Sequence, residues 1–223
     1  ATVPTHQEPG GRASGALRGK FYGKDGVLDC IATNDSELAP PGATPTLDTL
    51  PRRIAEFATL GDALDYGATG KRGLNFHDAR ANLTRAWTYG ELRDDALAHA
   101  RRLVTLGVRP GDRVALIAET GPEFAASFFG AVYAGAWPVP LPLPTSFAGR
   151  DSYVEQLKVQ LQSSDPALFL YPHELESFTA EAAAQLGVTA RTWESLDEIE
   201  QSLSGLPTAD PDDIAYLQYS SGS

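Results

Sequence analysis

The sequence contains no methionine and only one cysteine, Cys30. A single cysteine excludes an internal disulfide, which is typical of proteins from a reducing cytoplasm. Ala1 occupies the first position, so we expect a trimmed chain, an internal piece of a longer one, or a chain written without its modified methionines. The first twenty residues have no apolar segment of the signal-peptide type. These features together indicate a cytoplasmic protein.

Long basic runs are also absent, since Lys and Arg never occur in runs of more than two and the net charge is −11. Nucleic-acid surfaces cluster these residues, so this class of partner is excluded.

The acidic residues at 210, 212 and 213 predict a solvated turn rather than a metal cluster. No metal-ligand spacing connects the four histidines. They are His6, His77, His99 and His173.

One stretch without charge imitates a membrane span. No charged residue occurs between Phe124 and Gly149. However, prolines at alternate positions from 138 to 144 cannot continue a helix. A helix that ends near Ala136 has about 15 residues and is roughly 22 Å long, against roughly 30 Å of hydrocarbon. We therefore predict a buried helix followed by a buried strand, and no membrane span.

Strands alternate with helices from Val114 onward. The apolar runs at 114–118, 137–141, 167–171, 188–193 and 214–219 predict strands, and the intervening patterns predict helices from Pro122, over 152–162 and over 174–186. Such alternation predicts parallel strands joined by right-handed crossovers. The fold class is therefore α/β, with a mostly parallel sheet flanked by helices.

The sequence before Val114 divides into two parts. Residues 1–45 are rich in Gly, Pro, Ala, Thr and Ser and predict a leader, a linker or a poorly ordered extension, although some apolar residues there could pack. Further along, Thr59 and Asp62 could cap a helix that runs to about residue 66. Residues 74–77 and 85–89 predict paired strands, and a capping box at 88–91 opens a helix that Gly107 ends.

The last ten residues are the main candidate site. The apolar run at 214–219 leads directly into Ser220, Ser221, Gly222 and Ser223. Serine hydroxyls, free backbone N–H groups and a glycine suit a phosphate group, and parallel sheets bind ligands beyond the carboxyl ends of their strands. The alternative is a strand followed by a solvated Ser/Gly tail. The fold and the loop chemistry together favour phosphate binding.

Three ordered stretches carry a resemblance to a known family. They are residues 87–92 (WTYGEL), 133–141 (YAGAWPVPL) and 214–223 (IAYLQYSSGS). In this order they resemble core motifs of the adenylate-forming superfamily of acyl-CoA synthetases, peptide-synthetase adenylation domains and luciferases, and residues 108–116 (VRPGDRVAL) also fit. Residues 74–80 (LNFHDAR) and 140–150 (PLPLPTSFAGR) are most similar to fatty acyl-AMP ligases.

This resemblance implies the amino-terminal part of the large domain of an adenylate-forming enzyme. Residues 46–223 would belong to its AMP-binding domain and would stop inside the phosphate-binding loop, so that no catalytic residue and no metal ligand is expected in this chain. The implied reaction uses ATP and Mg²⁺ to convert a fatty acid into an acyl-adenylate. The acyl group would then pass to an acyl carrier protein or a polyketide or peptide synthetase. The alternatives are an acyl-CoA synthetase, another adenylation enzyme, or a non-catalytic binding or folding fragment.

Overall fold

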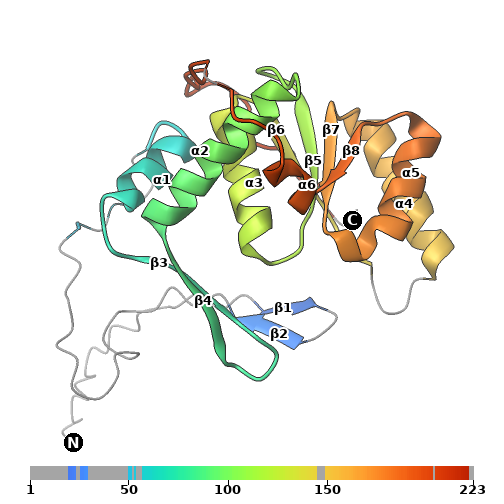
Figure 1. Cartoon of the computed structure of the whole chain (residues 1–223), viewed down its shortest axis with the longest axis horizontal. Coiled ribbons are helices and arrows are strands. Elements are labelled where there is room, and N and C mark those ends of the chain that lie inside the picture. The colour runs from blue at the N-terminus through green and yellow to red at the C-terminus, as the bar shows by residue number, and fades with distance from the viewer. Residues whose placement is uncertain are drawn as a thin grey trace, which may run out of the picture.

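A four-stranded parallel sheet forms the centre of the molecule (Figure 1). The computed structural model describes residues 20–23, 26–29, 50, 51, 53, 57–144, 149–202 and 204–220. The strand order is β6-β5-β7-β8, and every neighbouring pair is parallel. The predicted α/β fold is thus confirmed. The strands are β5 (Arg113–Ile117), β6 (Trp137–Leu141), β7 (Leu168–Tyr171) and β8 (Ala190–Thr192).

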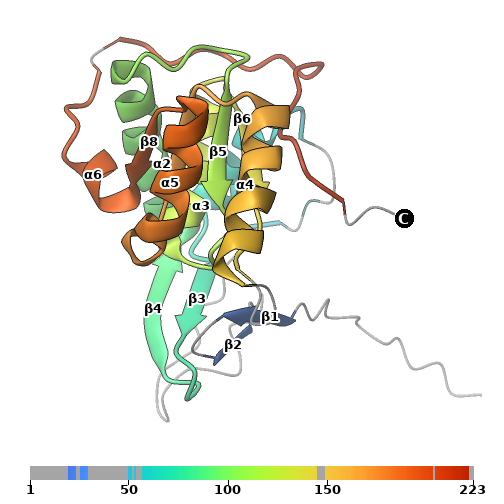
Figure 2. The ribbon, with the colours of Figure 1, turned by 90° about the vertical axis from the view of Figure 1, so that its right-hand side faces the viewer.

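Helices cover both faces of this sheet (Figures 1 and 2). One face carries α2 (Tyr89–Thr105), α3 (Pro122–Tyr133) and the short α6 (Trp193–Asp197). The other face carries α4 (Arg150–Ser164) and α5 (Glu176–Leu186), and the 3₁₀ turn η1 (His173–Leu175) precedes α5. The molecule therefore has the three-layer arrangement that alternating strands and helices predict.

The central strand β5 supplies side chains to both layers of helices. Val114 and Leu116 belong to the core under α2, α3 and α6, whereas Ala115 and Ile117 belong to the core under α4 and α5. This division follows from the alternation of side chains along a strand. Because both faces are covered, the strand reads as a continuous apolar run.

A smaller unit precedes the sheet in sequence. Helix α1 (Leu60–Ala68) is followed by the antiparallel pair β3 (Gly73–His77) and β4 (Leu83–Thr88), as predicted. Trp87 is only 2% exposed and packs with residues of α1, α2 and α3 in a third core. This core joins the pair to the main body of the molecule.

Side-chain caps fix where two of the helices begin. Thr59 Oγ1 accepts a hydrogen bond from the Asp62 N–H of α1, and the Asp62 carboxylate accepts one from the Thr59 N–H. Thr88 and Glu91 make the same reciprocal pair at the start of α2. Both capping boxes are predicted from sequence and both are present.

The antiparallel strands β1 (Lys20–Gly23) and β2 (Gly26–Asp29) lie within residues 1–45. Two details differ from the expected elements. Trp193 begins α6 instead of ending a strand. Residues 214–219 form no strand. By contrast, the uncharged stretch is a helix followed by a strand, as predicted, and none of the described helices is long and apolar enough to cross a bilayer.

Candidate phosphate-binding segment

Residues 214–220 lie along the outer edge of β6, and we call them the edge segment. Among the described residues, one backbone hydrogen bond joins the segment to the sheet: the Leu217 N–H donates to the Pro138 carbonyl oxygen at 3.0 Å. The prediction of a strand at 214–219 is therefore wrong. The segment is extended beside the sheet but forms no regular ladder with it.

The two prolines of β6 explain why the edge segment forms no regular ladder with the sheet. Successive residues of a parallel strand direct their backbone groups alternately to the two sides. The N–H of Trp137 and the carbonyl oxygen of Leu141 bond towards β5, whereas the Pro138 carbonyl accepts from the edge segment. Pro138 and Pro140 thus face outward, and neither has an N–H. This edge of the sheet offers carbonyl acceptors without donors.

Side chains of the edge segment alternate between the two helical layers. The Tyr216 ring makes an edge-on contact with Phe128 of α3, with ring centroids 5.8 Å apart. Leu217 packs against the core under α4 and α5. The Tyr219 hydroxyl donates to the carbonyl oxygen of Gln160 on α4 at 2.9 Å and also contacts Ser163 Oγ. The side chains therefore have the period of a strand even though the backbone ladder is incomplete.

The edge segment runs in the same direction as β6. Ala215 lines a cavity together with Gly135 and Ala136, which directly precede β6. Two residues further along, the Leu217 N–H bonds to the carbonyl oxygen of Pro138. The chain thus advances from the amino end of the sheet towards its carboxyl end, and Figure 2 shows it descending beside α4. This is the direction that a phosphate loop beyond the carboxyl end of the sheet requires.

Of the four predicted site residues, the structure describes Ser220, which is exposed to solvent. Ser221, Gly222 and Ser223 lie outside the described residues. The structure thus brings the chain to the start of the loop. Phosphate binding by these four residues stays a prediction.

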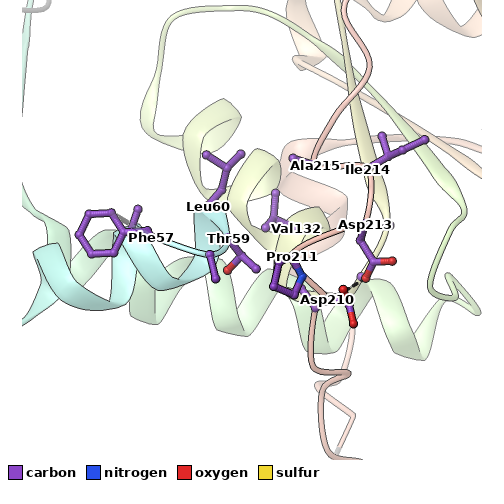
Figure 3. Close-up of a pocket in the computed structure, with 14 residues that line it drawn as sticks. Phe57, Thr59, Leu60, Val132, Asp210, Pro211, Asp213, Ile214 and Ala215 are labelled. Atoms are coloured by element: carbon purple, nitrogen blue, oxygen red, sulfur yellow. Dashed lines mark hydrogen bonds between the residues drawn. The ribbon is translucent and has the colours of Figure 1, made fainter. Parts of the chain in front are cut away.

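A cavity of about 450 Å³ lies at the opposite end of the sheet (Figure 3). The start of α1, the end of α3, residues 209–211 and residues 213–215 line it. Its carboxylates belong to the predicted turn: Asp213 Oδ2 accepts from the Asp210 N–H at 2.8 Å, and Asp210 Oδ1 accepts from the Asp212 N–H at 3.0 Å. The turn is confirmed, and the cavity is separate from the candidate phosphate site.

Buried His99 contacts a serine and an aspartate from other helices, and the spacing of the histidines in the sequence does not reveal these contacts. Its Nδ1 lies 3.0 Å from Ser127 Oγ on α3, and its Nε2 lies 3.5 Å from Asp197 Oδ1 on α6. The order Ser–His–Asp resembles a hydrolase triad, but Ser127 is fully buried and no substrate could reach it. Burial lowers the pKa of His99, against the opposing effect of Asp197. The histidine joins α2 to α3 and α6.

Metal binding has no support in the described part of the chain. There, no group of three or more His, Cys, Asp or Glu residues is placed to hold an ion. His173 pairs with Glu176 on the surface at 3.3 Å, and no metal-ligand set forms around it.

Comparison with protein families decides the assignment. The family of AMP-binding enzymes matches residues 71–223, which is more than half of the chain. The chain belongs to this family. It is thus a member of the adenylate-forming ligases, as the ordered motifs indicate.

Individual relatives agree with this. A Caulobacter vibrioides protein assigned as an acyl-CoA synthetase is 42% identical over 180 residues, which are 81% of this chain and 31% of that protein. The medium-chain-fatty-acid–[acyl-carrier-protein] ligase JamA of Moorena producens is 29% identical over 176 residues, covering 75% of this chain and 29% of the ligase. A structure from work on fatty acyl-adenylate ligases of E. coli and L. pneumophila has a TM-score of 0.74 at 40% identity, with coverage of 78% and 31%. The chain spans about a third of the length of these relatives.

The first two of the ordered motifs have structural roles. The first supplies buried Trp87 and the cap of α2. In the second, Gly135 has a φ of +70°, and a Cβ there would lie 3.1 Å from Pro207 and 3.2 Å from Pro110. The same motif then supplies the prolines of β6. The second motif therefore builds the edge on which the third motif lies.

Proposed function

We propose that this AMP-binding enzyme activates a fatty acid as an acyl-adenylate and transfers the acyl group to an acyl carrier protein. The observation that carries the proposal is the edge segment, which leads along β6 into Ser220 and the three residues after it. Residues 46–223 would form the amino-terminal part of the adenylation domain. Residues 1–45 would be a leader or linker.

The chemistry explains why a phosphate loop is needed. An oxygen of the fatty acid carboxylate attacks the α-phosphorus of ATP. The bond from that phosphorus to the oxygen bridging to the β-phosphate breaks, and pyrophosphate leaves with the bonding electrons. This step depends on positioning and on neutralising phosphate charge, not on a covalent nucleophile. Ser220, Ser221, Gly222 and Ser223 would hold the β- and γ-phosphates.

The second step consumes the acyl-adenylate. The thiol of a phosphopantetheine arm attacks the acyl carbon, AMP leaves, and the thiol gives up its proton. The relative JamA, a medium-chain-fatty-acid–[acyl-carrier-protein] ligase, supports this acceptor. We expect Mg²⁺ to accompany the ATP phosphates, and we assign no described residue to it.

An experiment on the full-length gene product tests the proposal. Incubation with ATP and a panel of medium- and long-chain fatty acids should give acyl-adenylate by mass spectrometry. The Ser220→Ala/Ser223→Ala variant should lose about ten- to a hundredfold in kcat/KM for ATP, because hydrogen bonds to a charged group are lost. Ser204→Ala, at an exposed serine outside the loop, is the matched control. No acyl-adenylate with any fatty acid would refute the proposal.

An acyl-CoA synthetase is the second candidate, because the Caulobacter vibrioides relative at 42% identity carries that assignment. The two candidates share the first step and differ only in the thiol acceptor. Offering coenzyme A and holo-acyl carrier protein in parallel distinguishes them. Faster acylation of the carrier protein supports our proposal, and faster formation of acyl-CoA supports the alternative.

A further inference from the structure

We propose that Tyr219 is a positioning residue for the phosphate-binding loop, anchoring the edge segment to the carboxyl-terminal part of α4. The inference rests on the proposed function, since it assigns the loop to ATP. Tyr219 immediately precedes Ser220, the first loop residue. Its role would be to set the position from which the loop reaches the phosphates.

The hydroxyl of Tyr219 makes two contacts across a sequence separation of more than fifty residues. It donates its proton to the Gln160 carbonyl oxygen at 2.9 Å. It also contacts Ser163 Oγ, and in that contact either hydroxyl can be the donor. The Gln160 carbonyl lies near the end of α4 and also accepts hydrogen bonds from Ser164 Oγ at 2.7 Å and Ser163 Oγ at 3.2 Å. The Tyr219 hydroxyl therefore joins the edge segment to a group of hydroxyls gathered around this carbonyl oxygen.

The anchor is important because the outer edge of β6 lacks backbone N–H donors. A regular edge strand is held by a row of backbone hydrogen bonds, but Pro138 and Pro140 remove the outward donors of β6. Among the described residues, the single bond from Leu217 to Pro138 joins the two backbones. Side chains must then hold the edge segment in place. Tyr219 is the one nearest to the loop.

Tyr216 provides a comparison within the same segment. Both tyrosines are exposed, at 43% for Tyr216 and 39% for Tyr219. Tyr216 contacts Phe128 through its ring, whereas Tyr219 contacts α4 through its hydroxyl. Removing each hydroxyl therefore separates loss of the anchor from a general effect of substituting a tyrosine in this segment.

Steady-state kinetics of the full-length gene product test the proposal, with Tyr219→Phe as the test variant and Tyr216→Phe as the control. We expect Tyr219→Phe to raise the KM for ATP about two- to tenfold. This factor corresponds to the free energy that one ordinary hydrogen bond contributes. The KM for the fatty acid and the melting temperature should stay at the wild-type values. Ser163→Ala, which removes one of the two contacts, should have a smaller effect in the same direction. An unchanged KM for ATP in Tyr219→Phe would overturn the proposal.

Hydrogen–deuterium exchange gives a readout that does not need activity. In the ATP-free protein, amides of residues 214–223 should exchange faster in Tyr219→Phe than in wild type or Tyr216→Phe. Equal exchange in all three proteins contradicts the anchor. If wild type makes no acyl-adenylate, the proposed function fails while the exchange result still decides whether Tyr219 anchors the segment.

Discussion

His99 shows how one buried side chain can make stability depend on pH. The groups facing it are Ser127 on α3, Asp197 on α6, and Arg102 and Asp95 on its own helix. Burial is the largest effect and lowers the pKa of His99 below its usual 6.5, and Arg102 acts in the same direction. The folded protein therefore keeps His99 neutral under conditions where the unfolded chain begins to take up a proton.

The sign of the pH dependence follows. Below about pH 6.5 the unfolded state binds more protons at this site, so the free energy of unfolding falls as the pH falls towards the lowered folded-state pKa. Melting temperatures measured from pH 7.5 to 5.5 should decline. His99→Asn, which can keep the bond to Ser127, should decline less, and exposed His173→Asn should follow wild type. A decline equally steep in His99→Asn would contradict this assignment.

At the scale of single elements, the edge of β6 yields a prediction about backbone pairing. Replacing Pro138 and Pro140 by Ala restores two outward N–H groups beside the edge segment. We expect additional backbone hydrogen bonds and slower hydrogen–deuterium exchange at residues 214–219. Pro110→Ala, at an exposed proline in the turn before β5, is the control and should leave this exchange unchanged. Unchanged exchange in the double variant would show that the missing donors do not limit pairing.

These elements also show what sequence patterns can and cannot predict. The capping boxes at Thr59 and Thr88 are local, because the groups that bond lie three residues apart, and both are predicted correctly. The edge segment has the apolar, β-prone pattern of a strand, but a strand also needs a partner with free donors and acceptors. Its pattern does not reveal that the neighbouring edge consists of Pro138 and Pro140. Such failures arise where a structure depends on distant neighbours.

At the scale of the whole molecule, the order of strands and helices could be predicted because each buried strand is a continuous apolar run between helical patterns. The same order predicts a phosphate site at the carboxyl side of the sheet, and that site stays a prediction. The contacts of His99 and Tyr219 could not be predicted. Each joins residues that lie far apart in sequence and that only the packed helices bring together.

The last prediction concerns the 223-residue chain by itself. It spans about a third of its relatives and includes Ser220–Ser223 of the candidate loop. Adenylate formation requires the carboxylate, the α-phosphate and the neutralising charges to be held together. We therefore expect the isolated chain, folded as judged by circular dichroism, to show no ATP–pyrophosphate exchange with any fatty acid. The full-length gene product, assayed in parallel, should show exchange. Exchange by the 223-residue chain above a no-enzyme control would mean that these residues contain a complete adenylation site.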